Sequence, residues 1–172
     1  MTKQENSYSL WLRPAQEHID DLNKIISKLA HRYHALPFPA HITLLSSITT
    51  DLSSLNTICK SVTEKQKIFD IALEEVAFSD VYFKNLFINA QPEKELLNLH
   101  KNISNKLNHN KHKDYLPHIS LLYGMLDEKT QQTLKKQLDG SYLKTFSCQR
   151  LDIYNTTRKE SEWHLIKSFN LT

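Results

Sequence analysis

His41-Ile42-Thr43-Leu44-Leu45 and His118-Ile119-Ser120-Leu121-Leu122 are two copies of one pattern, in which a hydroxyl residue follows a histidine by two positions within an aliphatic segment. A proline precedes each copy, Pro39 in the first and Pro117 in the second. Residues i and i+2 of a β-strand lie on the same face. The pattern therefore predicts two strands, each presenting one imidazole and one hydroxyl from a surface whose opposite face is anchored in a core.

The two segments belong to a repeat that spans most of the chain. His118 follows His41 by 118 − 41 = 77 positions. Further matches at this offset are Lys67, Phe69, Glu75 and Val76 with Lys144, Phe146, Asp152 and Ile153. We therefore expect a single domain over residues 1–172 that contains an internal duplication, with halves of about 7–80 and 81–171.

Hydrophobic periodicity predicts the same order of elements in each copy: strand, helix, histidine-bearing strand, helix, strand and strand. The strand at 81–90 both ends the first copy and opens the second. The expected strands cover residues 7–13, 42–48, 68–78, 81–90, 119–123, 144–155 and 162–171, with a tight turn at 79–80. The expected helices cover residues 17–34, a segment from 51 or 53 to about 62, residues 96–107, and a segment through Leu134 and Leu138 that ends at Gly140.

These elements favour an α+β fold of two similar lobes with pseudo-two-fold symmetry. Two antiparallel sheets flanked by helices would then surround a central cleft. A mixed sheet without internal symmetry is the alternative.

The composition excludes several classes of site. With 40% hydrophobic and 24% charged residues, the chain has the make-up of a globular protein. Its two glycines are too few for the glycine-rich loops that hold phosphates in dinucleotide and triphosphate folds. The net charge of +3 assists binding of a phosphorylated ligand but is too small for a surface that coats nucleic acid.

The sequence also sets expectations for location, redox state and metals. No apolar run approaches the ~20 residues of a membrane span and no signal-peptide pattern is present, so a cytoplasmic location with no membrane partner is expected. A monomer is expected as well. Cys59 and Cys148 lack metal-ligand spacing and are too few for a disulfide framework, which leaves a single bridge between them as the alternative to two free thiols. The pair His109 and His112 lies in a polar segment typical of a solvated loop, so no metal site is expected.

Two facing histidine strands would form a site suited to cyclic phosphates. Opening a cyclic phosphodiester needs a base that takes a proton from the attacking water and an acid that protonates the departing sugar oxygen. His41 and His118 can supply both near neutral pH, because the ordinary pKa of an imidazole is about 6.5. Thr43 and Ser120 would bind the non-bridging phosphate oxygens. This chemistry requires neither a metal nor a cofactor.

The two motifs resemble those of the two-histidine (2H) phosphoesterase superfamily, whose signature is a pair of His-x-(Thr/Ser)-x motifs in a bilobal α+β fold. Within it, the chain length, the strand Tyr8-Ser9-Leu10-Trp11 and the segment from His118 to Tyr123 are similar to the plant and fungal cyclic phosphodiesterases. The resemblance implies hydrolysis of nucleoside 2′,3′-cyclic phosphates and ADP-ribose 1″,2″-cyclic phosphate to 2′-phosphorylated products, a reaction associated with by-products of tRNA splicing. It also implies His118 as the base and His41 as the acid, an order that the residues alone leave open.

Two other functions remain open at the level of sequence. One is an RNA-end-processing 2H enzyme, which would act on RNA 2′,3′-cyclic phosphates or, in a ligase-like reaction, on 2′-5′ linkages. The other is a nucleotide-binding module without catalysis, against which the intact motif residues argue. The modest charge, and the lack of a basic stripe interleaved with aromatic residues, favour a small-molecule partner over RNA 3′ ends.

Three further residues are weaker candidates for the substrate site. Tyr123 matches a tyrosine of the related sites, but strict alternation places it opposite His118 unless a bulge or the strand end turns it inward. Trp11 is a candidate for stacking on a base, with an ordinary core position as the alternative. Lys84 is a candidate phosphate contact, with a solvated strand edge as the alternative.

Overall fold

A computed structural model describes residues 6–109, 115–142 and 144–172 of the chain. The strands in these ranges are β1 (Tyr8–Pro14), β2 (Ile42–Ile48), β3 (Phe69–Phe78), β4 (Leu86–Ala90), β5 (His118–Leu122), β6 (Thr145–Asn155) and β7 (His164–Asn170). The helices are α1 (Gln16–Arg32), α2 (Leu52–Thr63), α3 (Lys94–Lys106) and α4 (Glu128–Leu138), with short 3-10 turns η1 (Tyr82–Lys84) and η2 (Glu160–Glu162). The order β-α-β-α-β thus occurs twice, from β1 to β3 and from β4 to β6; common descent of the halves remains a prediction.

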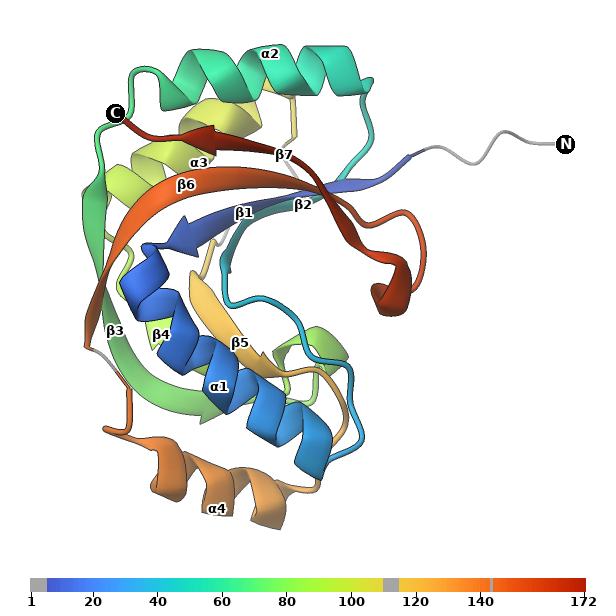
Figure 1. Cartoon of the computed structure of the whole chain (residues 1–172), viewed down its shortest axis with the longest axis vertical. Helices are drawn as coiled ribbons and strands as arrows, with labels where there is room; N and C mark the ends of the chain where they lie inside the picture. Colours follow the sequence, from blue (N-terminus) through green and yellow to red (C-terminus); the bar gives the residue numbers. More distant parts are fainter. Residues whose placement is uncertain (1–5, 110–114, 143) are drawn as a thin grey trace, which may run out of the picture.

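The strands form one antiparallel sheet that curves back on itself. Its order is β1-β2-β5-β4-β3-β6-β7, and a further pairing between β1 and β6 joins strands that lie far apart in this order. Half of the sheet is β2-β1-β6-β7 and the other half is β5-β4-β3, and β2 and β5 meet at the pair Ile42 and Ile119. Figure 1 shows the strands curving around the middle of the molecule. The α+β fold of two lobes is confirmed, and the two expected sheets are joined into one.

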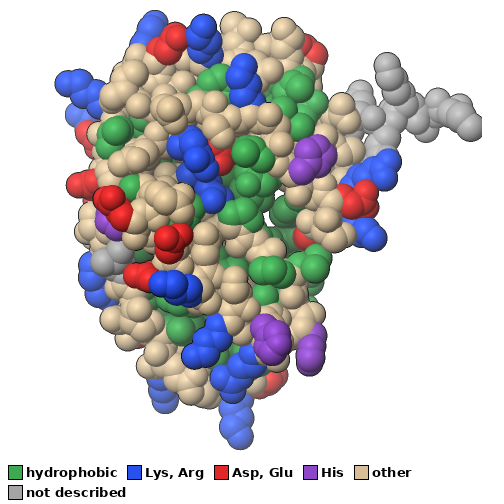
Figure 2. All heavy atoms as spheres, viewed as in Figure 1, with side chains coloured by type: hydrophobic (Ala, Val, Ile, Leu, Met, Phe, Trp, Pro, Cys, Tyr) green, Lys and Arg blue, Asp and Glu red, His purple; other side chains and the backbone are tan. Residues whose placement is uncertain are grey.

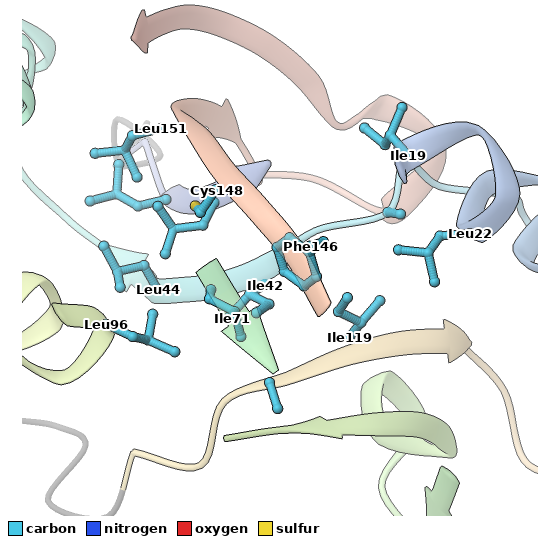
Figure 3. Close-up of a cluster of buried hydrophobic side chains, with 14 of the residues drawn as sticks. Ile19, Leu22, Ile42, Leu44, Ile71, Leu96, Ile119, Phe146, Cys148 and Leu151 are labelled. Carbon is cyan, nitrogen blue, oxygen red and sulfur yellow. The ribbon is translucent and has the colours of Figure 1, made fainter. Parts of the chain in front are cut away.

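The helices cover the outer face of the sheet, and each packs on a strand from the other half of the chain. α1 packs on β5, α3 on β2 and α4 on β3. In Figure 1, α2 and α3 lie at one end and α1 and α4 at the other. The core between helices and sheet holds side chains from both halves, and those labelled in Figure 3 include Ile19, Ile42, Leu96, Ile119 and Phe146. Burial of this one face leaves the inner face of the sheet for a site.

Two helices begin at equivalent aspartates. The carboxylate of Asp51 accepts a hydrogen bond from the backbone N–H of Ser54 at the start of α2. The carboxylate of Asp127 accepts one from the N–H of Thr130 at the start of α4. Such caps contribute about 1 kcal/mol each. Of the two starts that the sequence allowed for α2, the structure has the one capped by Asp51.

The segment expected as a strand over 81–90 differs from the prediction. η1 occupies its first part, and β4 begins only at Leu86. The side chain of Asn85 donates to the carbonyl of Ser79 at 3.1 Å, and the Ser79 hydroxyl donates to the carbonyl of Lys84 at 2.5 Å. These side chains bind backbone groups that a ladder would otherwise pair, so the connection is longer than the tight turn predicted. As a result Lys84 lies at the end of η1, beside the inner face of the sheet.

Candidate active site

The two histidine motifs lie side by side on the inner face. Ile42 and Ile119 pair across β2 and β5, and both are fully buried in the core. In an antiparallel pair the residues before and after this point face each other across the strands, on the opposite side of the sheet. The register therefore places His41 opposite Ser120, and Thr43 opposite His118. The four motif residues that the sequence selected are His41, Thr43, His118 and Ser120, and they share one surface.

Both motif imidazoles are fixed by the same local hydrogen bond. Nδ1 of His41 lies 2.6 Å from the carbonyl oxygen of Pro39, and Nδ1 of His118 lies 2.9 Å from that of Leu116. Because a carbonyl only accepts, Nδ1 carries the proton of each neutral ring and Nε2 has the lone pair. His164, exposed at the start of β7, makes the same bond to the carbonyl two residues before it. The hydrogen bond to Nδ1 therefore fixes the tautomer of a histidine but does not by itself mark an active-site residue. The register between β2 and β5 does so, because it brings His41 and His118 onto one surface.

Trp11 supports His41. The rings of Trp11 and His41 are stacked with centroids 3.7 Å apart, and Tyr154 stacks on Trp11 at the same distance. Because β1 lies between β2 and β6, the two partners cover opposite faces of the indole. Its Nε1–H donates to the hydroxyl of Ser9 at 2.9 Å, and the side chain is 2% exposed. Trp11 therefore lies at the site, but both of its faces are already occupied and no base can stack on it.

Burial keeps His41 neutral in the free protein. Burial is the largest cause that lowers the pKa of His41 to about 3, and the nearby positive charge of Arg13 contributes to this shift. The pKa of His118 is also lowered, first by burial and then by the charge of Lys84. His118 also lowers the pKa of His41, which places the two rings within electrostatic range of each other. A bound phosphate anion would raise both pKa values, because an opposite charge favours the imidazolium.

Arg13 belongs to a buried cluster of charges beside His41. On β1 it follows Trp11 by two residues and therefore shares its face; it is 7% exposed. Nε of Arg13 lies 3.8 Å from a carboxylate oxygen of Asp152, whose other oxygen lies 2.9 Å from Nε of Arg150. Two guanidinium groups thus share one carboxylate, so the cluster has a net positive charge. That charge favours a neutral His41 and an anionic ligand.

Tyr123 reaches the inner face through a bulge. The register between β4 and β5 shifts after the pair Leu86 and Leu122, and both Leu121 and Leu122 are buried in the core. Two consecutive core positions reverse the alternation, so the next residue points to the side of Ser120. Tyr123 stacks on Phe38 with centroids 3.8 Å apart. Tyr123 therefore does not follow the strict alternation that would place it opposite His118. The structure has the alternative, in which a bulge turns Tyr123 to the inner face.

An aromatic pocket of about 70 Å³ is lined by Trp11 and Phe38, two aromatic rings that contact His41. Its aromatic walls are Trp11, Phe38, Tyr123, Tyr154 and Trp163. Trp163 comes from the β6–β7 connection, and its ring also stacks on Phe83 of η1 at 5.7 Å. Figure 2 shows hydrophobic side chains around a hollow in the middle of the molecule.

A second and larger pocket of about 260 Å³ lies on the side of His118. Thr43 and Lys84 line it together with His118. The ammonium of Lys84 lies 4.4 Å from the ring centroid of Phe87, which contacts the ring of His118 edge to face at 5.3 Å. Burial lowers the pKa of Lys84. Lys84 therefore belongs to the site rather than to a solvated edge.

The described residues hold no group of three or more His, Cys, Asp and Glu side chains placed to bind a metal ion. His112, one of the pair considered from the sequence, lies outside the described residues. Within the described ranges, no helix is long and apolar enough to cross a membrane. Cys59 and Cys148 are free thiols buried in the core.

A family model described as "Cyclic phosphodiesterase-like protein" matches residues 6–171. The chain belongs to this cyclic phosphodiesterase-like family. The match covers both histidine motifs and nearly every element of the fold. Membership places the chain in the 2H phosphoesterase superfamily and, at the level of the family, among phosphodiester hydrolases.

Relatives of known sequence or structure agree with this family assignment. The cyclic phosphodiesterase of Arabidopsis thaliana is 24% identical over 174 residues, which cover 95% of this chain and 94% of that protein. The apo crystal structure of Escherichia coli LigT has a TM-score of 0.68 at 12% identity and covers 99% of each chain. The protein TT0787 of Thermus thermophilus has a TM-score of 0.64 at 13% identity, with coverage of 96% and 97%. At these identities the two structures show the common fold.

Sequence reasoning missed Arg13, Phe38 and Tyr154. Alternation along β1 could have located Arg13, because it lies two residues after Trp11. Alternation along β6 likewise places Tyr154 on the face opposite the buried Ile153. Phe38 gave no such signal, since it lies in a connection between two prolines.

Proposed function

We propose that the protein hydrolyses nucleoside 2′,3′-cyclic phosphates to 2′-phosphorylated nucleotides by acid–base catalysis between His41 and His118. The observation that carries the proposal is the opposed register of the two motifs, which sets each imidazole across from a hydroxyl. The family match and the Arabidopsis relative, a cyclic phosphodiesterase, support the reaction class.

The proposed reaction needs two proton transfers. The water oxygen forms a bond to phosphorus while Nε2 of one imidazole takes a proton from that water. The bond between phosphorus and the 3′ oxygen breaks, and Nε2–H of the other imidazole gives its proton to the departing oxygen. Thr43 and Ser120 donate hydrogen bonds to the non-bridging oxygens, where negative charge gathers. For this the Ser120 hydroxyl turns from the carbonyl of Phe83, to which it donates in the free protein, to the phosphate. Each proton transfer is typically worth roughly 10²–10⁴-fold in rate.

The electrostatics of the free site favour one order of these transfers. His41 is the more deeply enclosed imidazole and has Arg13 beside it, so the first proton to enter the pair goes to His118. His41 would then act as the base and His118 as the acid. The resemblance of the motifs implied the reverse order, and the two orders predict different titrations.

A nucleotide is the substrate class that the relatives favour. Crystal structures of E. coli LigT exist in complex with 3′-AMP, ATP and NADP+. ADP-ribose 1″,2″-cyclic phosphate also contains a five-membered cyclic phosphodiester on a ribose, across different ribose oxygens, and is proposed as a second substrate of the same site. An RNA terminus with a 2′,3′-cyclic phosphate is the rival substrate.

The test is hydrolysis of adenosine 2′,3′-cyclic phosphate in the presence of EDTA, followed by ³¹P NMR. We expect turnover that EDTA leaves unchanged and a product with the phosphate on the 2′ oxygen. Absence of turnover would refute the proposed reaction. Loss of activity with EDTA would refute its independence of metal, and a 3′ product would refute the direction of ring opening.

A further inference from the structure

The pocket beside His118 extends away from the place where a cyclic phosphate must bind. Acid–base catalysis requires that phosphate to lie within reach of both His41 and His118. The second pocket is lined by His118 and by the consecutive residues 43–46 of β2, a run of roughly 10 Å at about 3.3 Å per residue. Neither His41 nor Ser120 lines it. The pocket therefore starts at Thr43 and His118, beside the position between the imidazoles, and extends from there along β2 to Ser46.

The chemistry of this pocket fits an anion. Lys84 contributes an ammonium, and Thr43 and Ser46 contribute hydroxyls. None of the described residues that line the pocket is acidic. Burial alone accounts for the lowered pKa of Lys84, and no carboxylate of the described chain raises it. The cation is thus held beside Phe87 without a counter-charge from the described residues.

Such a cation is unfavourable in the free protein. Lys84 loses part of its hydration, and its charge opposes protonation of the neighbouring His118. A ligand anion would offset both effects, because it would pair with the ammonium and restore the charge balance near His118. At about 260 Å³ the pocket has room for roughly eight water molecules at ~30 Å³ each, which is more than one phosphate group needs.

We infer that the part of this pocket formed by Ser46 and Lys84 binds a second phosphate of the substrate, carried on the 5′ oxygen of the nucleoside that bears the cyclic phosphate. Lys84 then acts as a specificity residue that selects nucleotides with a 5′ phosphate over nucleosides with a 5′ hydroxyl. This inference rests on the proposed function, since it uses the cyclic phosphate to place the ligand. The 5′ phosphate could belong to a free nucleotide or to the preceding unit of an oligoribonucleotide.

The first test compares two substrates that differ only at the 5′ position, adenosine 2′,3′-cyclic phosphate with a 5′ hydroxyl or with a 5′ phosphate. For the wild type, kcat/KM should be about tenfold higher with the 5′ phosphate, as expected for one charge-assisted contact. In Lys84→Gln this ratio should fall towards one, and in Lys84→Arg, which retains the charge, it should persist. Lys101→Gln, an exposed lysine of α3, is the matched control and should keep the ratio. An unchanged ratio in Lys84→Gln would overturn the inference, including the case in which both substrates slow equally.

A binding measurement separates this inference from the proposed function. Calorimetric titration with adenosine 2′-monophosphate and adenosine 2′,5′-bisphosphate should show tighter binding of the bisphosphate to the wild type and loss of that preference in Lys84→Gln. If this holds without turnover of either cyclic substrate, the second phosphate site stands and the proposed reaction fails. If both cyclic substrates turn over but the preference is absent or survives in Lys84→Gln, the reaction stands and the second site is refuted.

The source of the phosphate is decided by a third substrate, a diribonucleotide that ends in a 2′,3′-cyclic phosphate. Here the 5′ oxygen carries a bridging diester instead of a terminal phosphate. If Lys84→Gln lowers kcat/KM more for the diribonucleotide than for the mononucleotide with a 5′ phosphate, the source is an oligoribonucleotide. If the loss of kcat/KM is smaller for the diribonucleotide, the source is a free nucleotide. If hydrolysis of neither substrate depends on Lys84, the inference is refuted.

Discussion

His41 and His118 have the same tautomer but different surroundings. His41 is 3% exposed, stacked on Trp11 and near Arg13, whereas His118 lies at the wall of an open pocket. Burial disfavours the charged form of an imidazole. The two rings should therefore differ in the pH at which each becomes charged, which is the difference that separates a base from an acid.

This difference is measurable by ¹⁵N NMR titration of the histidine rings in the free protein. We predict that both active-site imidazoles titrate below the ordinary pKa of about 6.5, and that His118 takes up a proton at higher pH than His41. His164, exposed at the start of β7, provides the reference resonance. Protonation of His41 before His118 would contradict the assignment of His41 as the base.

The motif hydroxyls should contribute less than the imidazoles. Thr43→Ala and Ser120→Ala each remove one donor to the phosphate, so kcat/KM should fall by about tenfold to a hundredfold, the value of a hydrogen bond to a charged group. In the free protein the single hydroxyl proton of Ser120 is donated to the carbonyl of Phe83 at 2.9 Å, so the loss of this hydroxyl should disturb η1 as well. Thr57→Ala on the exposed face of α2 serves as the control. Full activity in both hydroxyl variants would show that they do not contact the phosphate.

Among the elements, the contact between β2 and β5 determines how the motifs face each other. Ile42 and Ile119 form the described pair between these strands, and both are fully buried. We predict that Ile119→Ala costs about 2–5 kcal/mol of unfolding free energy and that Ile119→Val costs about 1. Urea unfolding would measure both.

Activity should follow a different pattern in these two variants. Because the cavity in Ile119→Ala lies beneath the two imidazoles, kcat should fall at temperatures where the variant remains folded, and Ile119→Val should retain most activity. Ile103→Ala, which also empties a fully buried position but on α3, is the control for lost stability alone. An equal loss of kcat in the Ile103 and Ile119 variants would argue that the strand contact has no special part in placing the site.

Much of this arrangement could be predicted from the order of elements and from alternation. Both histidine strands, their buried isoleucines and the helix cap at Asp51 follow from local pattern. The bulge that turns Tyr123 and the η1 turn that places Lys84 do not, because each depends on side-chain hydrogen bonds or ladder register between distant segments. The net charge near His41 was missed for a similar reason, since Arg13 and Asp152 meet only through the pairing of β1 with β6.

For the whole molecule, the neutral His41 links stability to pH. Its folded pKa is about 3 and that of an unfolded imidazole is about 6.5, so below pH 6.5 the unfolded chain binds a proton that the folded chain does not. The contribution of the neutral His41 to the free energy of unfolding is therefore complete above pH 6.5 and is lost as the pH falls towards 3.

We therefore predict that unfolding free energy decreases by about 2 kcal/mol between pH 6.5 and pH 5 because of His41, at roughly 1.4 kcal/mol per unit. Urea unfolding of the wild type and of His41→Gln at pH 6.5 and at pH 5 would measure this decrease. The variant should lose less stability over this interval than the wild type does. A decrease of the same size in both would show that His41 is not held neutral by the fold.

The central claim is that the two motifs form one acid–base site. Its most direct test is kcat for adenosine 2′,3′-cyclic phosphate with EDTA present, measured for the wild type, His41→Ala, His118→Ala and the control His164→Ala, which removes a histidine with the same local hydrogen bond. We predict that each motif variant loses roughly 10²–10⁴-fold in kcat while circular dichroism shows an intact fold, and that the control keeps its activity. Near-normal turnover by either folded motif variant would contradict it.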